Sequence, residues 1–182
     1  MEFPVQTANP AKAEAACLVV PVFKNGDLLP AAAKLDDASE RLIGQLIERG
    51  DFDAKLGNVQ LIPFAPGLSA DRLMLVGLGE RETCQERAFI KALDAAFTTV
   101  AGLPAEDVAV AFTDVPLAER STAWKARMTA EAAQRAVYRF DEFKSEKAPR
   151  PRLETVTLLL SDADAADEAR EGARIGDAIG QG

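Results

Sequence analysis

Short apolar runs alternate with amphipathic segments along nearly the whole chain, and this alternation limits the folds open to it. The runs are rich in Val, Ile and Leu and bounded by Gly or Pro, as in buried strands, whereas the amphipathic segments repeat apolar residues at helical spacing. Strands are expected at residues 3–6, 17–23, 59–64, 72–77, 107–112 and 153–160, and helices at residues 38–49, 86–100, 121–137 and 162–180. Because helical crossovers pair strands in parallel and hairpins pair them antiparallel, this order predicts an α/β three-layer sandwich with a mixed, mostly parallel sheet.

Capping signals mark the ends of several of these elements. Asp37 followed three residues later by Glu40 resembles a capping box, so we expect a helix to begin after Asp37 and to end before Gly50. Asp162 or Asp164 is expected to begin the last helix. The valine-rich segment 107–112 is expected to form a buried central strand.

Charge and histidine content exclude several classes of function. The chain has no histidine among its 182 residues, which excludes a Ser-His-Asp triad and every zinc site that uses histidine. Its formal net charge of −8 disfavours unguided attraction to nucleic acid or anionic lipid. The apolar runs are shorter than the roughly 20 residues that cross a bilayer, and the N-terminus lacks the basic stretch of a secretory signal. We therefore expect a cytoplasmic protein without a membrane partner.

The cysteines and carboxylates have structural interpretations. Cys17 and Cys84 lack CxxC spacing and a secreted context, so we expect two free thiols. The acids of residues 162–168 resemble a metal-binding run, but they lie where a helix begins, and there they interact favourably with the helix dipole. Capping and solvation account for them.

Two glycines, Gly77 and Gly79, follow an expected strand and form a candidate phosphate-binding turn. Backbone amides in such a turn can cradle a phosphate. The turn lacks the third glycine of GxGxxG, however, and Glu80 and Glu82 add negative charge beside it. A purely structural turn is the favoured interpretation.

A basic cluster formed by Lys144, Lys147, Arg150 and Arg152 is a candidate polyanion patch. A solvated linker is the favoured interpretation, because charge runs are usually exposed surface. A DNA-contacting accessory role is the alternative, and the net charge weighs against it.

Three glycines recur every four residues on the last expected helix, at Gly172, Gly176 and Gly180. Each costs the helix about 1 kcal/mol relative to alanine. A stripe without side chains permits close backbone approach, so we expect it to face a neighbouring element or a second domain.

The segment at residues 138–147 resembles the signature that closes the N-terminal domain of the cytosolic leucyl aminopeptidases. The matching residues are Tyr138, Arg139, Phe140, Asp141 and Lys144, and we interpret them as structural, with the rings of Tyr138, Phe140 and Phe143 anchoring the end of a helix onto the core. A turn like that at Gly77 to Gly79 also occurs in the family.

The resemblance implies a macro-domain-like N-terminal domain over residues 1–160 and a closing interdomain helix over residues 161–182 that leads to a catalytic domain beyond this chain. In the family, that C-terminal domain holds two divalent metal ions, zinc or manganese, through Lys, Asp and Glu side chains, and the parent enzyme is a homo-hexamer. None of the metal-binding motifs occurs here. We therefore assign no catalytic, metal or cofactor residue and expect a structural or access-shaping role, with a nucleotide- or ADP-ribose-binding module of macro-domain type as the alternative.

Overall fold

The sheet is the centre of the computed structural model, which describes residues 1–142 and 152–182. Its strands are β1 (Val5–Gln6), β2 (Leu18–Val22), β3 (Val59–Ile62), β4 (Leu73–Gly77), β5 (Asp107–Val110) and β6 (Thr155–Leu159). In the described chain they form a six-stranded sheet with the order β1-β6-β5-β2-β4-β3. Neighbouring strands pair in parallel except β3, which is antiparallel to β4. The predicted mixed, mostly parallel sheet is confirmed.

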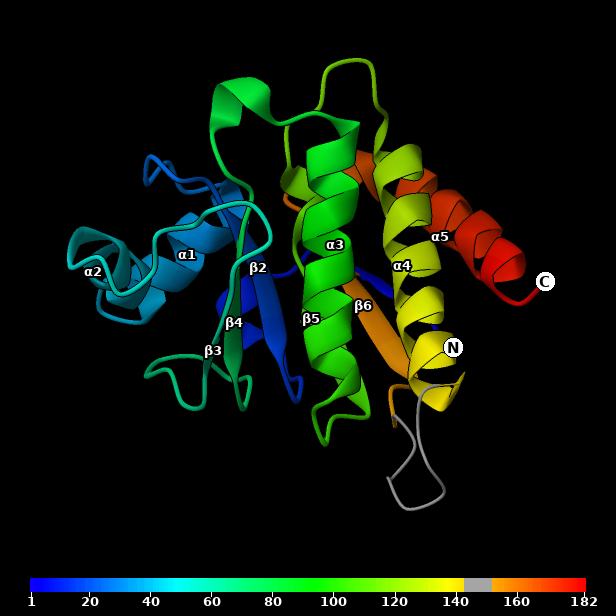
Figure 1. Ribbon diagram of the computed structural model, residues 1–182, viewed down its shortest axis with the longest axis horizontal. Coiled ribbons are helices and arrows are strands. Elements are labelled where there is room, and N and C mark those ends of the chain that lie inside the picture. Colours follow the sequence, from blue (N-terminus) through cyan, green and yellow to red (C-terminus); the bar gives the residue numbers. More distant parts are fainter. Residues whose placement is uncertain (143–151) are drawn as a thin grey trace.

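Helices cover both faces of this sheet. They are α1 (Pro30–Ala38), α2 (Leu42–Glu48), α3 (Glu86–Ala101), α4 (Thr122–Glu142) and α5 (Ala166–Gly180), with short 3-10 turns η1 (Pro10–Lys12), η2 (Arg81–Thr83), η3 (Phe112–Asp114) and η4 (Ala163–Ala165). Figure 1 shows α3 and α4 in front of the sheet with α5 beside α4, and α1 and α2 at the β3 end. The result is the expected three-layer α/β architecture.

Central strands are buried on both faces, which explains their continuous apolar sequences. In β2, Val19 joins the core beneath α3, α4 and α5, whereas Leu18 and Val20 join the core beneath α1 and α2. All five residues of β2 and of β4 are buried. By contrast β1 is only two residues long, and it lies at the sheet edge beside β6.

The expected capping box at Asp37 and Glu40 is wrong, and helix α1 was not among the expected helices. Asp37 lies inside α1, which begins at Pro30, where the fixed φ of proline suits a first helical position. Glu40 adopts a left-handed conformation with a φ of 57°. The first turn of α2 is bound instead by the buried Asp36, whose Oδ1 accepts a hydrogen bond from the Gly44 amide at 2.9 Å.

The glycines of α5 face α4, which confirms that they lie against a neighbouring element. A Cβ at Gly172 would lie 2.0 Å from the carbonyl oxygen of Ala123, and one at Gly176 would lie 2.5 Å from that of Arg127. The absence of side chains therefore lets the two helix backbones touch. Asp162 caps the turn that leads into α5, since its side chain accepts the Asp164 amide at 3.0 Å.

Candidate functional site

The carboxyl ends of β2, β4, β5 and β6 meet at one edge of the sheet, where α/β proteins usually place their sites. The chain runs from β2 to β4 on one side and then returns to β5 on the other, so the direction of winding reverses beside β2. The loops that follow these strands cover this edge, at residues 23–29, 78–85, 111–121 and 160–165. This edge is the candidate site, and the Gly77 to Gly79 turn belongs to it.

The backbone amides of this turn are engaged within the protein. Gly77 donates to the carbonyl of Asn58 at 2.8 Å, and Gly79 donates to that of Ala54 at 3.0 Å. The amide of the intervening Leu78 donates to Val22 at 2.9 Å. A phosphate on these amides would have to displace three backbone hydrogen bonds.

Close packing explains why glycines stand here. A Cβ at Gly77 would lie 2.0 Å from the carbonyl oxygen of Lys55, and Gly79 has a φ of +73° that favours glycine. Loop 54–58 therefore packs directly on the end of β4. This contact lies about twenty residues away in sequence, so only the folded structure reveals it.

Aromatic and charged side chains close the edge beside the turn. Phe23 and Phe112 are both fully buried. The guanidinium of Arg81 lies over the ring of Phe23, 5.5 Å from its centroid. Next to it, Lys24 forms an ion pair with Glu80 at 3.3 Å, which offsets part of the negative charge noted near the turn.

A buried lysine on α4 holds the η3 turn at the end of β5. The Nζ of Lys125 donates to the carbonyl of Thr113 at 2.5 Å and to that of Val115 at 3.2 Å. Burial lowers the pKa of Lys125, and the nearby Asp114 carboxylate opposes this shift. Asp114 in turn accepts hydrogen bonds from the Ser161 amide and hydroxyl, so the same turn joins α4 to the end of β6.

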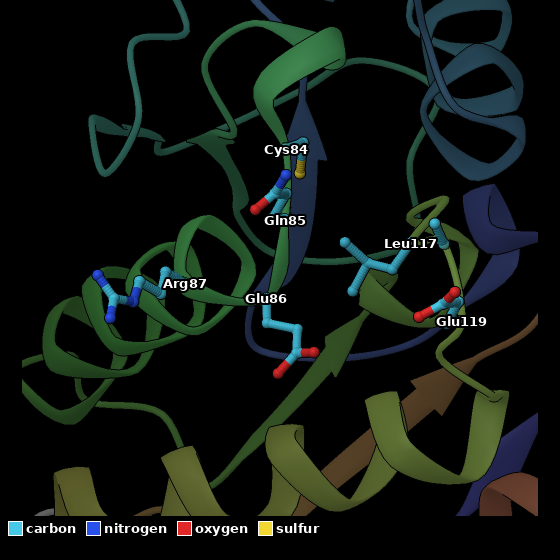
Figure 2. A pocket seen from close by; sticks show the side chains of 7 residues that line it. Cys84, Gln85, Glu86, Arg87, Leu117 and Glu119 are labelled. Carbon is cyan, nitrogen blue, oxygen red and sulfur yellow. The ribbon is translucent and has the colours of Figure 1, made fainter.

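A surface hollow of about 420 Å³ lies between the start of α3 and loop 115–121. It is lined by Cys84, Gln85, Glu86, Arg87, Leu117, Ala118 and Glu119, most of which Figure 2 labels. Burial raises the pKa of the Cys84 thiol, which keeps this group in its weakly nucleophilic protonated form. Glu86 is paired with Arg120, whose guanidinium lies 5.2 Å from the centroid of Trp124.

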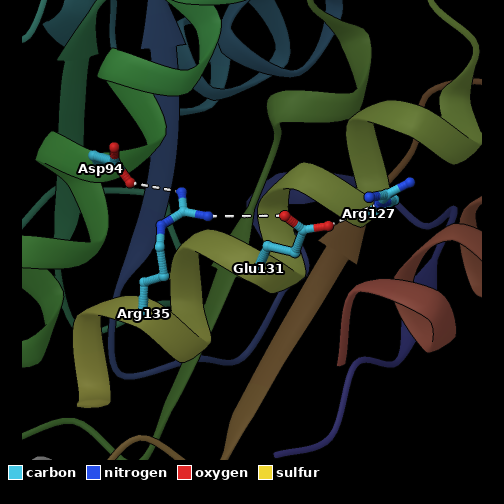
Figure 3. Close-up of polar contacts among 4 residues, drawn as sticks. All are labelled: Asp94, Arg127, Glu131 and Arg135. Atoms are coloured by element: carbon cyan, nitrogen blue, oxygen red, sulfur yellow. Dashed lines mark hydrogen bonds and ion pairs between the residues drawn. The ribbon is translucent and has the colours of Figure 1, made fainter. Parts of the chain in front are cut away.

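Charged side chains also join α3 to α4, as Figure 3 shows. Arg135 on α4 contacts Asp94 on α3 at 2.9 Å and Glu131 at 3.9 Å. The Oε1 of Glu131 also accepts a hydrogen bond from the Nε of Arg127, at 2.7 Å. No sequence pattern predicts this network, because its members come from two helices that only the fold brings together.

The signature segment lies at the end of α4. Tyr138 is 65% exposed, so the expected anchoring of its ring on the core is wrong; Ala136 and Val137 pack there instead. Arg139, Phe140 and Asp141 belong to α4, while Phe143 and Lys144 lie outside the described residues.

The basic cluster lies mostly outside the described residues, which leaves out Lys144, Lys147 and Arg150. Its remaining member, Arg152, is exposed, and its Nη1 is 4.0 Å from the Oε1 of Glu106. Arg152, one of the four candidate polyanion contacts, is thus paired with the acidic side chain of Glu106.

Both cysteines are free, as expected. Within the described part of the chain, no group of three or more Cys, Asp or Glu side chains is arranged to hold a metal ion. In the same ranges no helix has both the length and the apolar character needed to span a membrane.

Comparison with known proteins identifies the family. The model of the cytosol aminopeptidase family, N-terminal domain, matches residues 19–147. A probable cytosol aminopeptidase of Chromohalobacter salexigens is 71% identical over the whole chain, and a cytosol aminopeptidase of Pseudomonas aeruginosa is 34% identical. The chain spans 36% and 37% of the length of these two relatives.

Solved structures share the fold. A mutant of tomato leucine aminopeptidase matches 98% of this chain and 36% of its own, with a TM-score of 0.70 and 18% identity. The macrodomain of Thermus aquaticus DarG matches 87% of this chain and 97% of its own, with a TM-score of 0.61 and 12% identity. At these identities the likeness concerns the fold alone. Taken with the family match, it leads to one conclusion: the chain belongs to the cytosol aminopeptidase family and is its N-terminal domain.

Proposed function

We propose that this chain is the non-catalytic N-terminal domain of a metal-dependent leucyl aminopeptidase. Residues 1–160 would form its macro-domain-like body, and residues 161–182 would form the helix that leads into the catalytic domain. The proposal rests on how much of its relatives the chain spans. The whole chain aligns with only 36% of the length of a 71% identical relative that is named as a probable cytosol aminopeptidase. The family model that matches the chain is that of the N-terminal domain.

The chemistry of the polar groups supports a structural role for this domain. Lys125, the buried amine at the candidate edge, is bound to two backbone carbonyls. The thiols of Cys17 and Cys84 both have raised pKa values, so neither is an activated nucleophile. Glu86, at the surface hollow, is paired with Arg120. These groups hold loops and helices together.

Catalysis would then belong to the remainder of the parent polypeptide. There, Lys, Asp and Glu side chains would bind two divalent metal ions, zinc or manganese, and this domain would stabilise a cytoplasmic homo-hexamer or shape access to the active site. Its partners would be the C-terminal catalytic domain of the same polypeptide and further copies of the enzyme.

A deletion experiment tests whether this domain contributes to assembly or substrate access rather than to catalysis. The full-length parent and a version lacking residues 1–160 are compared for hydrolysis of leucine amide with zinc or manganese, and for assembly by light scattering. We expect the full-length protein to hydrolyse the amide and the deletion to lose its assembly or change its substrate range. An unaltered mass and an unaltered substrate range in the deletion would contradict the proposed role.

Fold likeness to the DarG macrodomain favours the second candidate, an ADP-ribose or nucleotide site at the Gly77 to Gly79 turn. The internal hydrogen bonds of the turn weigh against it. Calorimetric titration with ADP-ribose separates the two functions, because a binding module gives saturable heat whereas a scaffold domain gives none.

A DNA contact through Lys144, Lys147, Arg150 and Arg152 is the third candidate. Four phosphate contacts would give a slope of about −3.6 for the logarithm of affinity against the logarithm of salt concentration. A flat and weak response in a duplex titration would reject this role.

A further inference from the structure

The asparagines of this chain differ in the residue that follows each of them. Asn9 precedes a proline, Asn58 precedes a valine, and Asn25 precedes Gly26. No other Asn or Asp in the sequence precedes a glycine. The side chains of Asn9, Asn25 and Asn58 are all exposed to solvent. They therefore share access to water, but they differ in how easily the next backbone nitrogen can reach the side-chain amide.

Asn25 and Gly26 lie in the turn that follows β2. The Gly26 amide donates to the Phe23 carbonyl at 3.2 Å, and the Oδ1 of Asn25 accepts a hydrogen bond from the Asp27 amide at 3.4 Å. Both distances lie at or beyond the long end of ordinary N–H···O bonds. The bond to the Asp27 amide closes a ring that includes the Cγ of Asn25 and the Gly26 nitrogen. The side-chain carbonyl therefore lies beside the peptide bond that follows it.

Gly26 leaves this carbonyl open to its own nitrogen. Its φ is +79°, and a Cβ built on it would meet only the Cγ2 of Ile47, at 3.9 Å. A glycine can rotate its peptide unit without a steric penalty from a side chain. Opening the turn therefore requires only the loss of solvent-exposed hydrogen bonds, with no displacement of packed side chains.

We propose that Asn25 is a site of spontaneous deamidation through a cyclic imide. The Gly26 nitrogen, after giving its proton to hydroxide, bonds to the Cγ of Asn25; the bond from Cγ to the amide nitrogen breaks, and ammonia leaves with a proton taken from water. Water then adds to either carbonyl of the imide and breaks the bond from that carbonyl to nitrogen. The products at position 25 are an aspartate and an isoaspartate. This inference does not depend on the proposed aminopeptidase function.

The other two asparagines lack this route for different reasons. The proline after Asn9 has no amide hydrogen to lose, so its nitrogen cannot form the neutral imide. Asn58 leads into β3, where its carbonyl accepts the Gly77 amide at 2.8 Å and its Nδ2 donates to Asp53 at 2.8 Å. The branched side chain of Val59 also crowds the nitrogen that would attack.

Conversion of Asn25 changes how its loop is held. The Nδ2 of Asn25 donates to the Oδ2 of Asp27 at 3.1 Å, and the same oxygen is 3.9 Å from the Nη1 of Arg81 in η2. A carboxylate at position 25 cannot donate this bond and repels Asp27. The isoaspartate also lengthens the backbone of the turn by one atom. Loop 23–29 is therefore expected to lose part of its attachment to η2.

Peptide mapping of the full-length polypeptide tests the proposal. The folded protein is incubated in buffers from neutral to mildly alkaline pH, and peptide masses report the loss of each amide. We expect the amide of Asn25 to be lost, about tenfold faster per pH unit because the attacking nitrogen must first lose its proton. Both aspartate and isoaspartate are expected, while Asn9 and Asn58 persist. A persistent Asn25 amide, equally fast loss at Asn58, or aspartate without isoaspartate would overturn the proposal.

Two substitutions provide matched controls. Each converted molecule gains a negative charge, so the original protein is expected to develop an acidic band on isoelectric focusing. Asn25→Gln is expected to remove this band, because attack on the longer side chain would need a larger ring. Gly26→Ala is expected to slow the loss of the Asn25 amide by crowding the attacking nitrogen. An acidic band that develops at the original rate in either variant would overturn the assignment to the Asn25 and Gly26 pair.

Discussion

Replacing Gly172 by alanine is expected to destabilise the protein, although helix propensity alone predicts the opposite. The new Cβ would lie 2.0 Å from the carbonyl oxygen of Ala123 and 2.8 Å from its Cα. Both are backbone atoms of α4, so no side-chain rotation relieves the contact. Restoring ordinary separation requires α5 to move by more than about 1 Å, which would loosen the buried Ala169 and Ala173 on the same helix.

The two opposing energies can be compared directly. Alanine gains about 1 kcal/mol over glycine in helix propensity. Overpacking of a close contact costs about 1–3 kcal/mol, and a backbone clash of this size belongs at the upper end. The expected net loss is thus about 2 kcal/mol, which lowers the melting temperature by about 4–8 °C in a domain of this size.

Urea unfolding followed by the fluorescence of Trp124, the single tryptophan, measures this change, because the ring lies one residue from the contact. The control is Ala178→Gly at an exposed position of α5, which carries only the propensity cost of about 1 kcal/mol. A Gly172→Ala protein as stable as the original, or more stable, would refute the inference that these glycines serve helix contact.

Three further substitutions test other parts of the structure. Lys125→Met leaves two buried carbonyls without their donor and is expected to cost about 1–3 kcal/mol in urea unfolding, whereas Lys34→Met at an exposed position of α1 is expected to change little. Gly77→Ala places a Cβ against the Lys55 carbonyl oxygen and is expected to lower the melting temperature; an unchanged value would argue against the packing of loop 54–58 on β4. Burial raises the pKa of Cys17 from 9.0 to about 12, so the folded state holds a proton that the unfolded state loses above pH 9. Stability is therefore expected to fall between pH 9 and 12, by at most about 1.4 kcal/mol per pH unit from this thiol, and Cys17→Ala is expected to flatten that part of the pH profile.

The strands at the centre of the sheet were predictable, because burial on both faces demands continuous apolar sequence. The run that contains Leu18 and Val22 is an example, and only its ends differ from the expected range. The partner of β1 was not predictable, since β6 lies about 150 residues away in sequence and nothing in a two-residue strand specifies it.

Helix α1 was missed for a local reason. Its sequence has three alanines after Pro30, and alanine gives little contrast between a buried and an exposed face. The acids that follow then resembled the start of a helix rather than the end of one. The distinction depends on Asp36, which bonds to Gly44 in the next helix, a contact that spacing rules for local caps do not cover.

The candidate site was predictable in part. The glycines at Gly77 and Gly79 were found from their position after a strand, and their interpretation as a structural turn agrees with the hydrogen bonds seen there. The packing of loop 54–58 on these glycines was not predictable, because no sequence motif indicates a tertiary contact. The same holds for the contact of Lys125 with the η3 turn.

We expect this domain to carry no peptidase chemistry of its own. Its most direct test is the purified 182-residue chain, incubated with leucine amide in the presence of zinc or of manganese and assayed for release of leucine. We expect leucine to be released no faster than in buffer that contains the metal alone. Metal-dependent turnover by this chain, abolished by a chelator, would contradict it.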